Sequence, residues 1–406
     1  MDRCILHIDF NSYFATIEQQ ANPRLRGKPI GVTGGDRLER TVLGAASVEA
    51  KKLGIKTGMS LQETKRVCPN LILVRGDSDK YLSTTKRFLN ILKDYSPILE
   101  VFSIDEAFLE LRPADQPQVI KIAEEIKQRI RSEIGEWVRC SIGISYNKML
   151  SKLAGSLYKP DGLVLIADSE AALFILDRVK LDEVCGIGPG IKKRLNNLGV
   201  FDFKTLRQIP KQHLLASFKS YGEVLYRFAR GEDYNPVIPF FKKEEIKSAG
   251  HRHTFYKDTA DTEQIKQVLL KISELIARRL RAKNLTGKTI SFWYRSADFS
   301  GNGKQATINS TDNGLELFNA AWKIFWQIWD RKKIRMVGAS VTNLRSNKPS
   351  NLSFLPEEQH RQVISAVLDK INDRYGEFTL QRAVLLGSGN VRRKPNPYLS
   401  DYRFRI

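Results

Sequence analysis

The sequence has few of the residues that build zinc sites and disulfide frameworks. Its 406 residues include only four cysteines and five histidines. Neither type is grouped at metal-ligand spacing, which argues against a zinc site. The cysteines lie far apart along the chain, which predicts buried thiols in a reducing cytosol and a cytoplasmic protein. A disulfide-stapled secreted domain is thereby excluded.

Long apolar runs are also missing, and acidic residues are outnumbered. No stretch approaches the roughly 20 apolar residues that a membrane span needs, and no signal peptide precedes the first strand-like sequence. Lysine and arginine total 66 against 45 aspartates and glutamates, so the net charge is +21. This excess favours nucleic acid as partner, with a generally basic surface as the alternative. No basic amphipathic terminal helix supports membrane binding.

Two adjacent carboxylates, Asp105 and Glu106, interrupt an otherwise apolar and β-branched stretch. Neighbouring side chains on a strand point to opposite faces, so the pair can share one site only where the strand ends. We therefore expect a strand over 98–104, a tight turn at the two acids and a returning strand over 107–111. Taken alone, the pair is more typical of a solvated hairpin turn than of a metal site.

A third carboxylate, Asp9, ends the predicted buried strand 4–9, just before a helix that runs to about residue 20. A helix N-cap aspartate is the alternative reading of this residue. The other predicted elements around it are helices 79–95, 118–134 and 147–156 and strands 140–145 and 162–166. Without the insert between residues 13 and 77, their order is βαββαβ, the ferredoxin-like motif. The first and third strands are neighbours in this motif, so the three carboxylates should converge.

Three converging carboxylates repel one another unless a counter-charge lies between them. Oxygen ligands without histidine or cysteine select Mg²⁺, with Mn²⁺ as a substitute. Two such ions, about 3.5–4 Å apart on shared carboxylates, would activate an attacking oxygen and stabilise the leaving one in phosphoryl transfer. Asp9, Asp105 and Glu106 are therefore the candidate catalytic and metal-binding residues.

Glycines at 186, 188 and 190 separate two predicted helices, as in a helix-hairpin-helix that binds a DNA phosphate. The candidate contacts are Gly186, Gly188, Gly190, Lys192 and Lys193. The spacing does not fit a nucleotide-binding glycine loop, while a plain helical turn is the remaining alternative. A second glycine-linked helical pair is expected near 214–230.

A proline-containing linker over 233–245 leads into a second βαββαβ pattern. Its predicted elements are strand 247–256, helix 263–284, strands 288–296 and 304–309, helix 312–331 and strand 335–344. We expect the helix aromatics Trp322, Phe325, Trp326 and Trp329 to pack in the core. A basic sheet can hold phosphates without reading sequence, with Arg252 and Thr254 as candidate contacts. A helix over 359–375 and a strand over 380–386 should follow.

Three stretches resemble the Y-family of translesion DNA polymerases, in particular the bacterial DNA polymerase IV type. They are Asp-Phe-Asn-Ser-Tyr-Phe-Ala at 9–15, Ser-Ile-Asp-Glu-Ala-Phe at 103–108, and residues 145–162. The resemblance runs from residue 1 to about 345. It implies an α+β right-hand polymerase with a palm (1–12 and 78–167), fingers (13–77), a thumb (168–232), the linker, a little finger (246–345) and a C-terminal extension (346–406).

The resemblance also implies roles for single residues. Asp9, Asp105 and Glu106, with the backbone carbonyl of Phe10, match the metal ligands. Phe14 matches the steric gate under the sugar, and Lys159 matches a lysine that holds the triphosphate. The alternatives without a role in nucleotide binding are core packing for Phe14 and an ordinary surface position for Lys159. The remaining predicted nucleotide-binding residues are Tyr13, Ala46, Ser47 and Lys51.

The sequence departs from the family pattern on the helix that follows Ser47. Val48 and Lys51 stand where the family often has an aromatic residue and an arginine. Lysine keeps the charge but loses the bidentate fork, and valine cannot donate a hydrogen bond. These departures concern the triphosphate contacts and leave the acidic site unchanged.

A short segment, Asn351, Leu352, Ser353, Phe354 and Leu355, resembles the peptide with which bacterial replication proteins dock on the sliding clamp. A linker with two buried anchors is the alternative.

The function that these features predict is a low-fidelity, template-directed DNA polymerase for translesion synthesis. It would act as a monomer on primer–template DNA and deoxynucleoside triphosphates. A nucleotidyl cyclase with a related palm and a non-catalytic DNA-binding scaffold are the alternatives.

Overall fold

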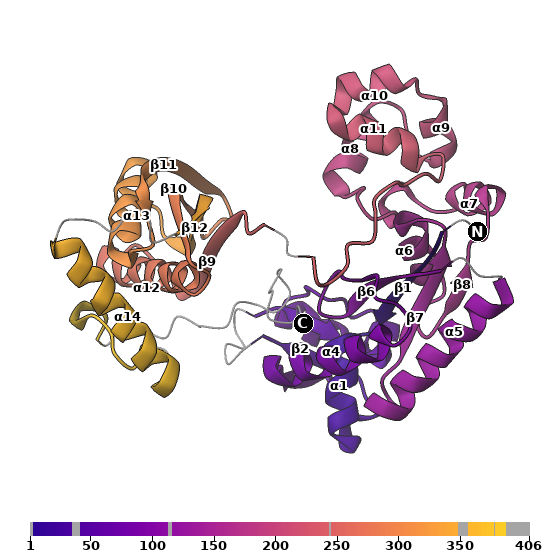
Figure 1. Ribbon diagram of the computed structural model, residues 1–406, viewed down its shortest axis with the longest axis horizontal. Coiled ribbons are helices and arrows are strands. Elements are labelled where there is room, and N and C mark those ends of the chain that lie inside the picture. Colours follow the sequence, from indigo (N-terminus) through magenta and orange to yellow (C-terminus); the bar gives the residue numbers. More distant parts are fainter. Residues whose placement is uncertain are drawn as a thin grey trace. The chain divides into compact units, whose positions relative to one another are not determined.

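The computed structural model describes residues 3–34, 41–112, 116–242, 245–347, 356–376 and 378–386 (Figure 1). The chain divides into two compact units, with the boundary along the chain between residues 242 and 245. Among the described residues, no helix is both long and apolar enough to cross a membrane.

A five-stranded sheet forms the centre of the first unit, in the order β5-β6-β1-β7-β8. Its strands are β1 (Cys4–Phe10), β5 (Leu99–Val101), β6 (Glu106–Leu111), β7 (Cys140–Ser145) and β8 (Leu163–Leu165). Strand β1 pairs antiparallel with β6 on one side and β7 on the other. This confirms that the first and third strands of the predicted motif are neighbours, while β8 extends the sheet in parallel with β7.

Strand β1 is buried on both faces because different elements cover each one. Leu6, Ile8 and Phe10 point into a core shared with the helices α4 (Ser78–Lys93) and α5 (Gln116–Arg129). The alternate residues Ile5, His7 and Asp9 therefore face the other way. Helix α5 continues without a break into a π-helical segment, Ile130–Ile134.

Helix α6 (Lys148–Leu157) packs closely on the face of the sheet that carries His7. Gly143 of β7 lies directly beside His7 in the strand register. A Cβ atom added to Gly143 would lie 2.1 Å from the backbone nitrogen of Gly155 in α6. Only glycine allows this close approach, which brings the lysines of α6 next to β1.

A smaller sheet in the order β3-β2-β4 is inserted between β1 and α4. Its elements are α1 (Tyr13–Ala21), a 3₁₀ turn (Pro23–Leu25), β2 (Ile30–Thr33), β3 (Leu43–Ala46), α2 (Val48–Lys52), α3 (Leu61–Val67) and β4 (Ile72–Arg75). Strand β4 was not expected from the sequence. It forms through a parallel pairing with β2, about forty residues earlier, which local patterns do not reveal.

Five short helices follow the first sheet: α7 (Ser169–Leu176), α8 (Pro189–Asn197), α9 (Phe203–Gln208), α10 (Lys211–Phe218) and α11 (Ser220–Phe228). Two expectations are wrong here. The helix expected before α8 is only a 3₁₀ turn, Leu181–Glu183. The second helical pair is joined at Lys219, whereas Gly222 lies inside α11, where an added Cβ would meet the carbonyl oxygen of Leu214 at 2.3 Å.

The segment after α11 lies along the first sheet as an extended strap. The backbone N–H of Phe240 donates to the carbonyl of Leu99 in the edge strand β5 over 2.7 Å. Val237 is buried against Ile5 and Phe108. The predicted linker therefore runs across a surface, as expected, and contributes to the packing of that surface.

The second unit confirms the repeated βαββαβ pattern. Its sheet has the order β11-β10-β12-β9. The elements are β9 (Ser248–Thr259), α12 (Thr262–Arg281), β10 (Leu285–Ser296), β11 (Gly301–Thr311), α13 (Gly314–Ile328) and β12 (Ile334–Ser346). Phe325 is fully buried, and Trp322 and Trp329 pack against the same core. Trp326 is 44% exposed, so its expected place in the core is wrong.

Helix α14 (Pro356–Tyr375) joins the second unit through ion pairs at its C-terminal half. Arg281 of α12 contacts the carboxylate of Asp369 at 2.6 and 2.8 Å. The strand expected over 380–386 is wrong, because these residues contain a 3₁₀ turn, Ala383–Leu385.

Candidate active site

Strand pairing brings Asp9 and Glu106 face to face. The two residues are direct partners in the antiparallel register of β1 and β6. Glu106 was expected in a turn, but it is the first residue of β6. Asp105 precedes the strand, and its carbonyl oxygen accepts a 3.1 Å hydrogen bond from the N–H of Phe10. The backbone thus holds all three acids at one end of two neighbouring strands.

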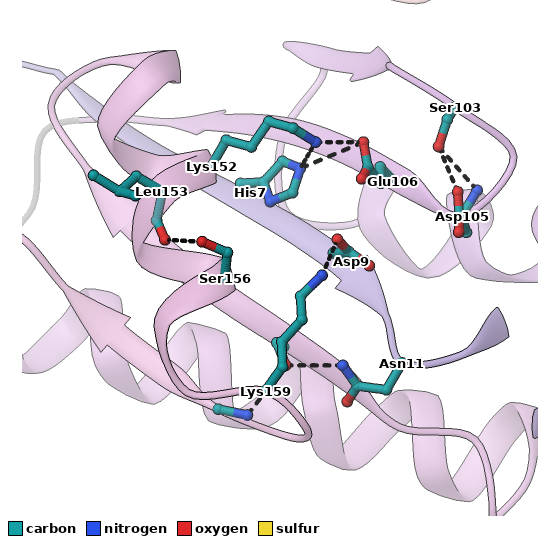
Figure 2. A network of polar contacts seen from close by, with 12 residues as sticks. His7, Asp9, Asn11, Ser103, Asp105, Glu106, Lys152, Leu153, Ser156 and Lys159 are labelled. Carbon is teal, nitrogen blue, oxygen red and sulfur yellow. Dashed lines mark hydrogen bonds and ion pairs between the residues drawn. The ribbon is translucent and has the colours of Figure 1, made fainter. Parts of the chain in front are cut away.

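Two lysines on one side of the sheet neutralise this pair (Figure 2). Lys159 forms an ion pair with Asp9, and Lys152 of α6 lies 2.6 Å from Glu106. The imidazole of His7 completes the group, with its Nε2 atom 3.8 Å from Glu106 and 3.4 Å from the ammonium of Lys152. His7 is 1% exposed, whereas the side chains of Lys152 and Glu106 are 20% and 19% exposed and that of Lys159 is 39% exposed.

The carboxylate of Asp105 makes a different contact. It accepts a 2.5 Å hydrogen bond from the hydroxyl of Ser103 (Figure 2). Among the described residues, one group of possible metal ligands has its atoms within 4.8 Å of one another, and it contains His7, Asp9 and Glu106. The structure therefore brings two of the three predicted ligands together and leaves the side chain of Asp105 bound to its own turn.

Burial and neighbouring charges shift the pKa values of the three acids in different directions. Burial raises the pKa of Asp9 to about 6, and the nearby charge of Glu106 acts in the same direction. Together these two effects outweigh the attraction of Lys159, which lowers the pKa. Burial also raises the pKa of Asp105, against the hydrogen bond from Ser103. Burial opposes ionisation of Glu106 too, but His7 and Lys152 outweigh it and lower its pKa to about 2. Burial lowers the pKa of His7, so the imidazole is neutral.

The donor set fits a hard divalent cation. Asp9 and Glu106 offer carboxylate oxygens at one point, with Asp105 adjacent in the chain. Burial is the largest cause of the raised pKa values of Asp9 and Asp105, so a bound cation would favour the ionised form of both carboxylates. His7 adds an imidazole nitrogen to the same group of possible ligands, and its Nε2 atom lies 3.4 Å from the ammonium of Lys152.

Two residues of this group, His7 and Lys152, were not predicted from the sequence. His7 precedes Asp9 by two positions, so strand periodicity places both on one face. Lys152 lies on α6, which ends at Leu157, two residues before Lys159. Both positions are visible in the sequence, but neither indicates which acid each residue would contact.

The predicted nucleotide residues Tyr13 and Phe14 begin α1 next to the acids. The hydroxyl of Tyr13 donates to the carbonyl of Tyr81 and contacts the hydroxyl of Thr85 at 2.7 Å. The ring of Phe14 is 4% exposed and packs on Tyr81, with 4.3 Å between ring centroids. Thr85 in turn donates to the carbonyl of Ile104, just before Asp105.

The other predicted nucleotide residues lie on β3 and α2. Ala46 and Ser47 are fully buried, and the hydroxyl of Ser47 caps α2 by accepting from the N–H of Ala50. Ser47 is therefore engaged in local structure. Burial and the neighbouring Lys159 lower the pKa of Lys51, while Asp9 and Asp105 act in the opposite direction.

The predicted DNA contacts in the helical segment surround the start of α8. Gly186 has φ 107°, and an added Cβ would meet the hydroxyl of Tyr221 at 2.7 Å. Gly188 caps α8, and Gly190 lies inside it. Lys192 pairs with Asp182 at 2.8 Å, and Lys193 is exposed.

The remaining predicted contacts belong to the second unit or lie outside the described structure. Arg252 is an exposed residue of β9, and Thr254 is half-buried two positions further along the same strand. The predicted clamp-binding segment, Asn351 to Leu355, lies outside the described residues.

Comparison with known proteins supports the relationship that these residues suggest. A family model described as the impB/mucB/samB family matches residues 8–156, and the model of its C-terminal domain matches residues 246–354. The DNA polymerase IV of Pelotomaculum thermopropionicum is 36% identical and covers 97% of this chain and 98% of its own length. That of Moorella thermoacetica is 34% identical, with 96% and 98% covered. The chain belongs to the impB/mucB/samB family, the Y-family of DNA polymerases.

A solved structure shows the same fold. A chimaeric Y-family DNA polymerase superposes with a TM-score of 0.73 at 24% identity, covering 85% of this chain and all of that chain. Within this Y-family chain, the first family match includes Asp9, Glu106 and Lys152 but ends before Lys159. The second match includes Arg252 and Thr254.

Replacing Asp9 by asparagine should stabilise the metal-free protein near neutral pH. The folded-state pKa of Asp9, about 6, exceeds its ordinary value of 3.8. The folded protein therefore holds this proton more tightly than the unfolded chain does, and stability falls as pH rises between these two values. In EDTA at about pH 7.5, the free energy of unfolding of Asp9→Asn should exceed that of the wild type by about 1–3 kcal/mol, with little difference near pH 4.

Chemical denaturation at both pH values measures the effect. Asp202 provides a control of opposite sign, because the backbone N–H of Thr205 lowers the pKa of this exposed carboxylate. Asp202→Asn should not stabilise the protein near neutral pH. A loss of stability for Asp9→Asn in EDTA would contradict the charge balance described above.

Proposed function

We propose that this chain is a template-directed, low-fidelity DNA polymerase that adds deoxynucleotides to a primer 3′-hydroxyl during translesion synthesis. The observation that carries the proposal is the direct pairing of Asp9 with Glu106, beside Asp105, within a Y-family fold. The names of its bacterial relatives support the same activity.

Asp9, Asp105, Glu106 and the carbonyl of Phe10 are the residues that would hold two Mg²⁺ ions, with Mn²⁺ as a substitute. Such ions, when bound, supply positive charge that activates the primer hydroxyl and neutralises the triphosphate. The depressed pKa of Glu106 keeps this carboxylate ionised at any working pH. Lys152 and His7 fix its orientation.

Lys159 and Lys51 are suited to hold the triphosphate on the side opposite the primer. Lys159 reaches Asp9, and Lys51 lies within the electrostatic field of Lys159 and of the acids. Ammonium groups bind phosphates as point charges. Val48 begins the same helix as Lys51 and adds no hydrogen-bond donor. Lys51 and Lys159 would therefore supply most of the positive charge that side chains bring to the triphosphate.

Each segment of the chain corresponds to one part of a right-hand polymerase in this proposal. The five-stranded sheet is the palm (1–12 and 78–167), the inserted sheet the fingers (13–77) and the helical segment the thumb (168–232). The strap is the linker (233–245), and the second unit begins with the little finger (246–345) and continues as the C-terminal extension (346–406). The start of α8 with Lys192 and Lys193, and Arg252 with Thr254 on β9, would contact DNA phosphates.

Primer extension tests the activity. The wild type should extend a primed template with dNTPs and Mg²⁺, and EDTA should abolish synthesis. Asp105→Ala should lower kcat by roughly a thousandfold or more. This loss corresponds to the several kcal/mol by which a bound cation stabilises the transition state. Asp94→Ala, at an exposed carboxylate paired with Arg129, is the matched control and should retain full activity. Undiminished extension by Asp105→Ala would reject the proposed mechanism.

Phe14→Ala should reduce discrimination against ribonucleotides by about a hundredfold, because a ring under the sugar leaves no room for a 2′-hydroxyl. The ratio of kcat/KM for a dNTP to that for the matching rNTP measures the effect. Ile17→Ala removes a buried side chain from the same helix and should leave the ratio unchanged. An unchanged ratio in Phe14→Ala would remove the gate role.

We also propose that residues 351–355 dock on a bacterial sliding clamp, and that the protein acts as a monomer in the cytoplasm. Deleting 351–355 should abolish the stimulation of synthesis by a loaded clamp and leave basal extension intact. Primer extension with and without the clamp measures both values. Equal loss of basal and clamp-stimulated synthesis would count against docking.

A further inference from the structure

The turn that carries Lys159 is anchored to the ends of two strands. The N–H of Asp161 donates to the side-chain oxygen of Asn11, just beyond β1, over 2.7 Å. The N–H of Gly162 donates to the hydroxyl of Ser141 in β7 over 3.2 Å. Asn11 also donates to Ser141, so one connected network holds the backbone that follows Lys159.

A third anchor comes from α5 on the other face of the sheet. The ammonium of Lys127 donates to the carbonyl of Asp161 over 2.5 Å and lies 3.0 Å from its carboxylate. It also reaches the carbonyl of Gly162 at 3.4 Å. Arg131 pairs with the second carboxylate oxygen of Asp161. The side chain of Lys127 is 13% exposed, so its bonds are largely shielded from water.

The conformation of the turn explains why it needs these anchors. Asp161 has φ 62°, in the left-handed region that is uncommon for residues other than glycine, although aspartate adopts it more often than most. An added Cβ on Gly162 would lie 2.3 Å from the carbonyl oxygen of Tyr158. The turn is therefore tight, and a displacement of Asp161 moves the backbone of Lys159 two residues away.

We propose that Lys127 is a positioning residue that acts on the active site through Lys159. Within the described part of the chain, the hydrogen bonds and the ion pair of Lys127 end on Asp161 and Gly162. Lys127 thus fixes the backbone from which the ammonium of Lys159 reaches toward Asp9. The inference rests on the proposed function, in which Lys159 binds the triphosphate of the incoming nucleotide.

A double-mutant cycle separates positioning from a general loss of structure. In Lys127→Gln, kcat/KM for dNTP should fall roughly tenfold, the effect of losing one charge-assisted hydrogen bond. The Kd for primer–template DNA should not change. In a Lys159→Ala background, the same substitution should lower kcat/KM by less than about twofold. The effects of two substitutions are not additive when one residue acts through the other.

Arg129→Gln is the matched control. Arg129 lies on the same helix, but its ion pairs join Asp94 and Glu133, away from the turn. Its removal should leave kcat/KM for dNTP unchanged. Should Lys127→Gln fail to fold, as judged by circular dichroism, Ser141→Ala tests the same turn from its opposite anchor and should show the same dependence on Lys159.

The outcomes distinguish this inference from the proposed function. If the wild type does not extend primers, the proposed function fails. If the wild type extends primers but Lys127→Gln lowers kcat/KM equally with and without Lys159, the positioning role is overturned. An unchanged kcat/KM in Lys127→Gln would overturn it as well.

Discussion

Carboxylates that are buried side by side require positive charge within contact distance, because an unpaired buried charge is costly. The first unit meets this requirement with lysines that come from separate elements. Lys152 comes from α6 and Lys159 from the turn that follows it. The raised pKa of Asp9 reflects burial first, with the nearby charge of Glu106 acting in the same direction and Lys159 acting against both. A carboxylate whose ionisation burial disfavours gains from a further cation, so the site is receptive to divalent metal.

The two faces of β1 explain how such a site is accommodated in a buried strand. One face packs into the main core, with Leu6 and Ile8 among its buried residues. The other presents His7 and Asp9 toward α6, which the glycine contact between β7 and α6 holds close. The apolar half of the strand offsets the cost of the polar half. Anchors from both faces of the sheet converge on the turn that carries Lys159, with Lys127 on one side and Asn11 at the strand end.

Much of this arrangement could be predicted from the sequence because its signals are local. The apolar periodicity indicated the helices and strands of both βαββαβ units, and their order indicated that β1 and β6 would be neighbours. The errors arose where non-local contacts decide. Strand β4 depends on a distant parallel partner, Trp326 is exposed although its neighbour Phe325 is buried, and Glu106 joins a strand because Asp9 pairs with it.

The amino-acid sequence by itself determined the three acids, their place at strand ends and the family, since motif spacing and strand order are properties of the chain. Only the tertiary structure decided which charges meet. It pairs Glu106 with Lys152 and His7, turns the carboxylate of Asp105 toward Ser103, and ties the Lys159 turn to Lys127 on α5. These contacts join residues from separate elements. Their partners depend on side-chain direction and distance in the packed molecule, which no local pattern records.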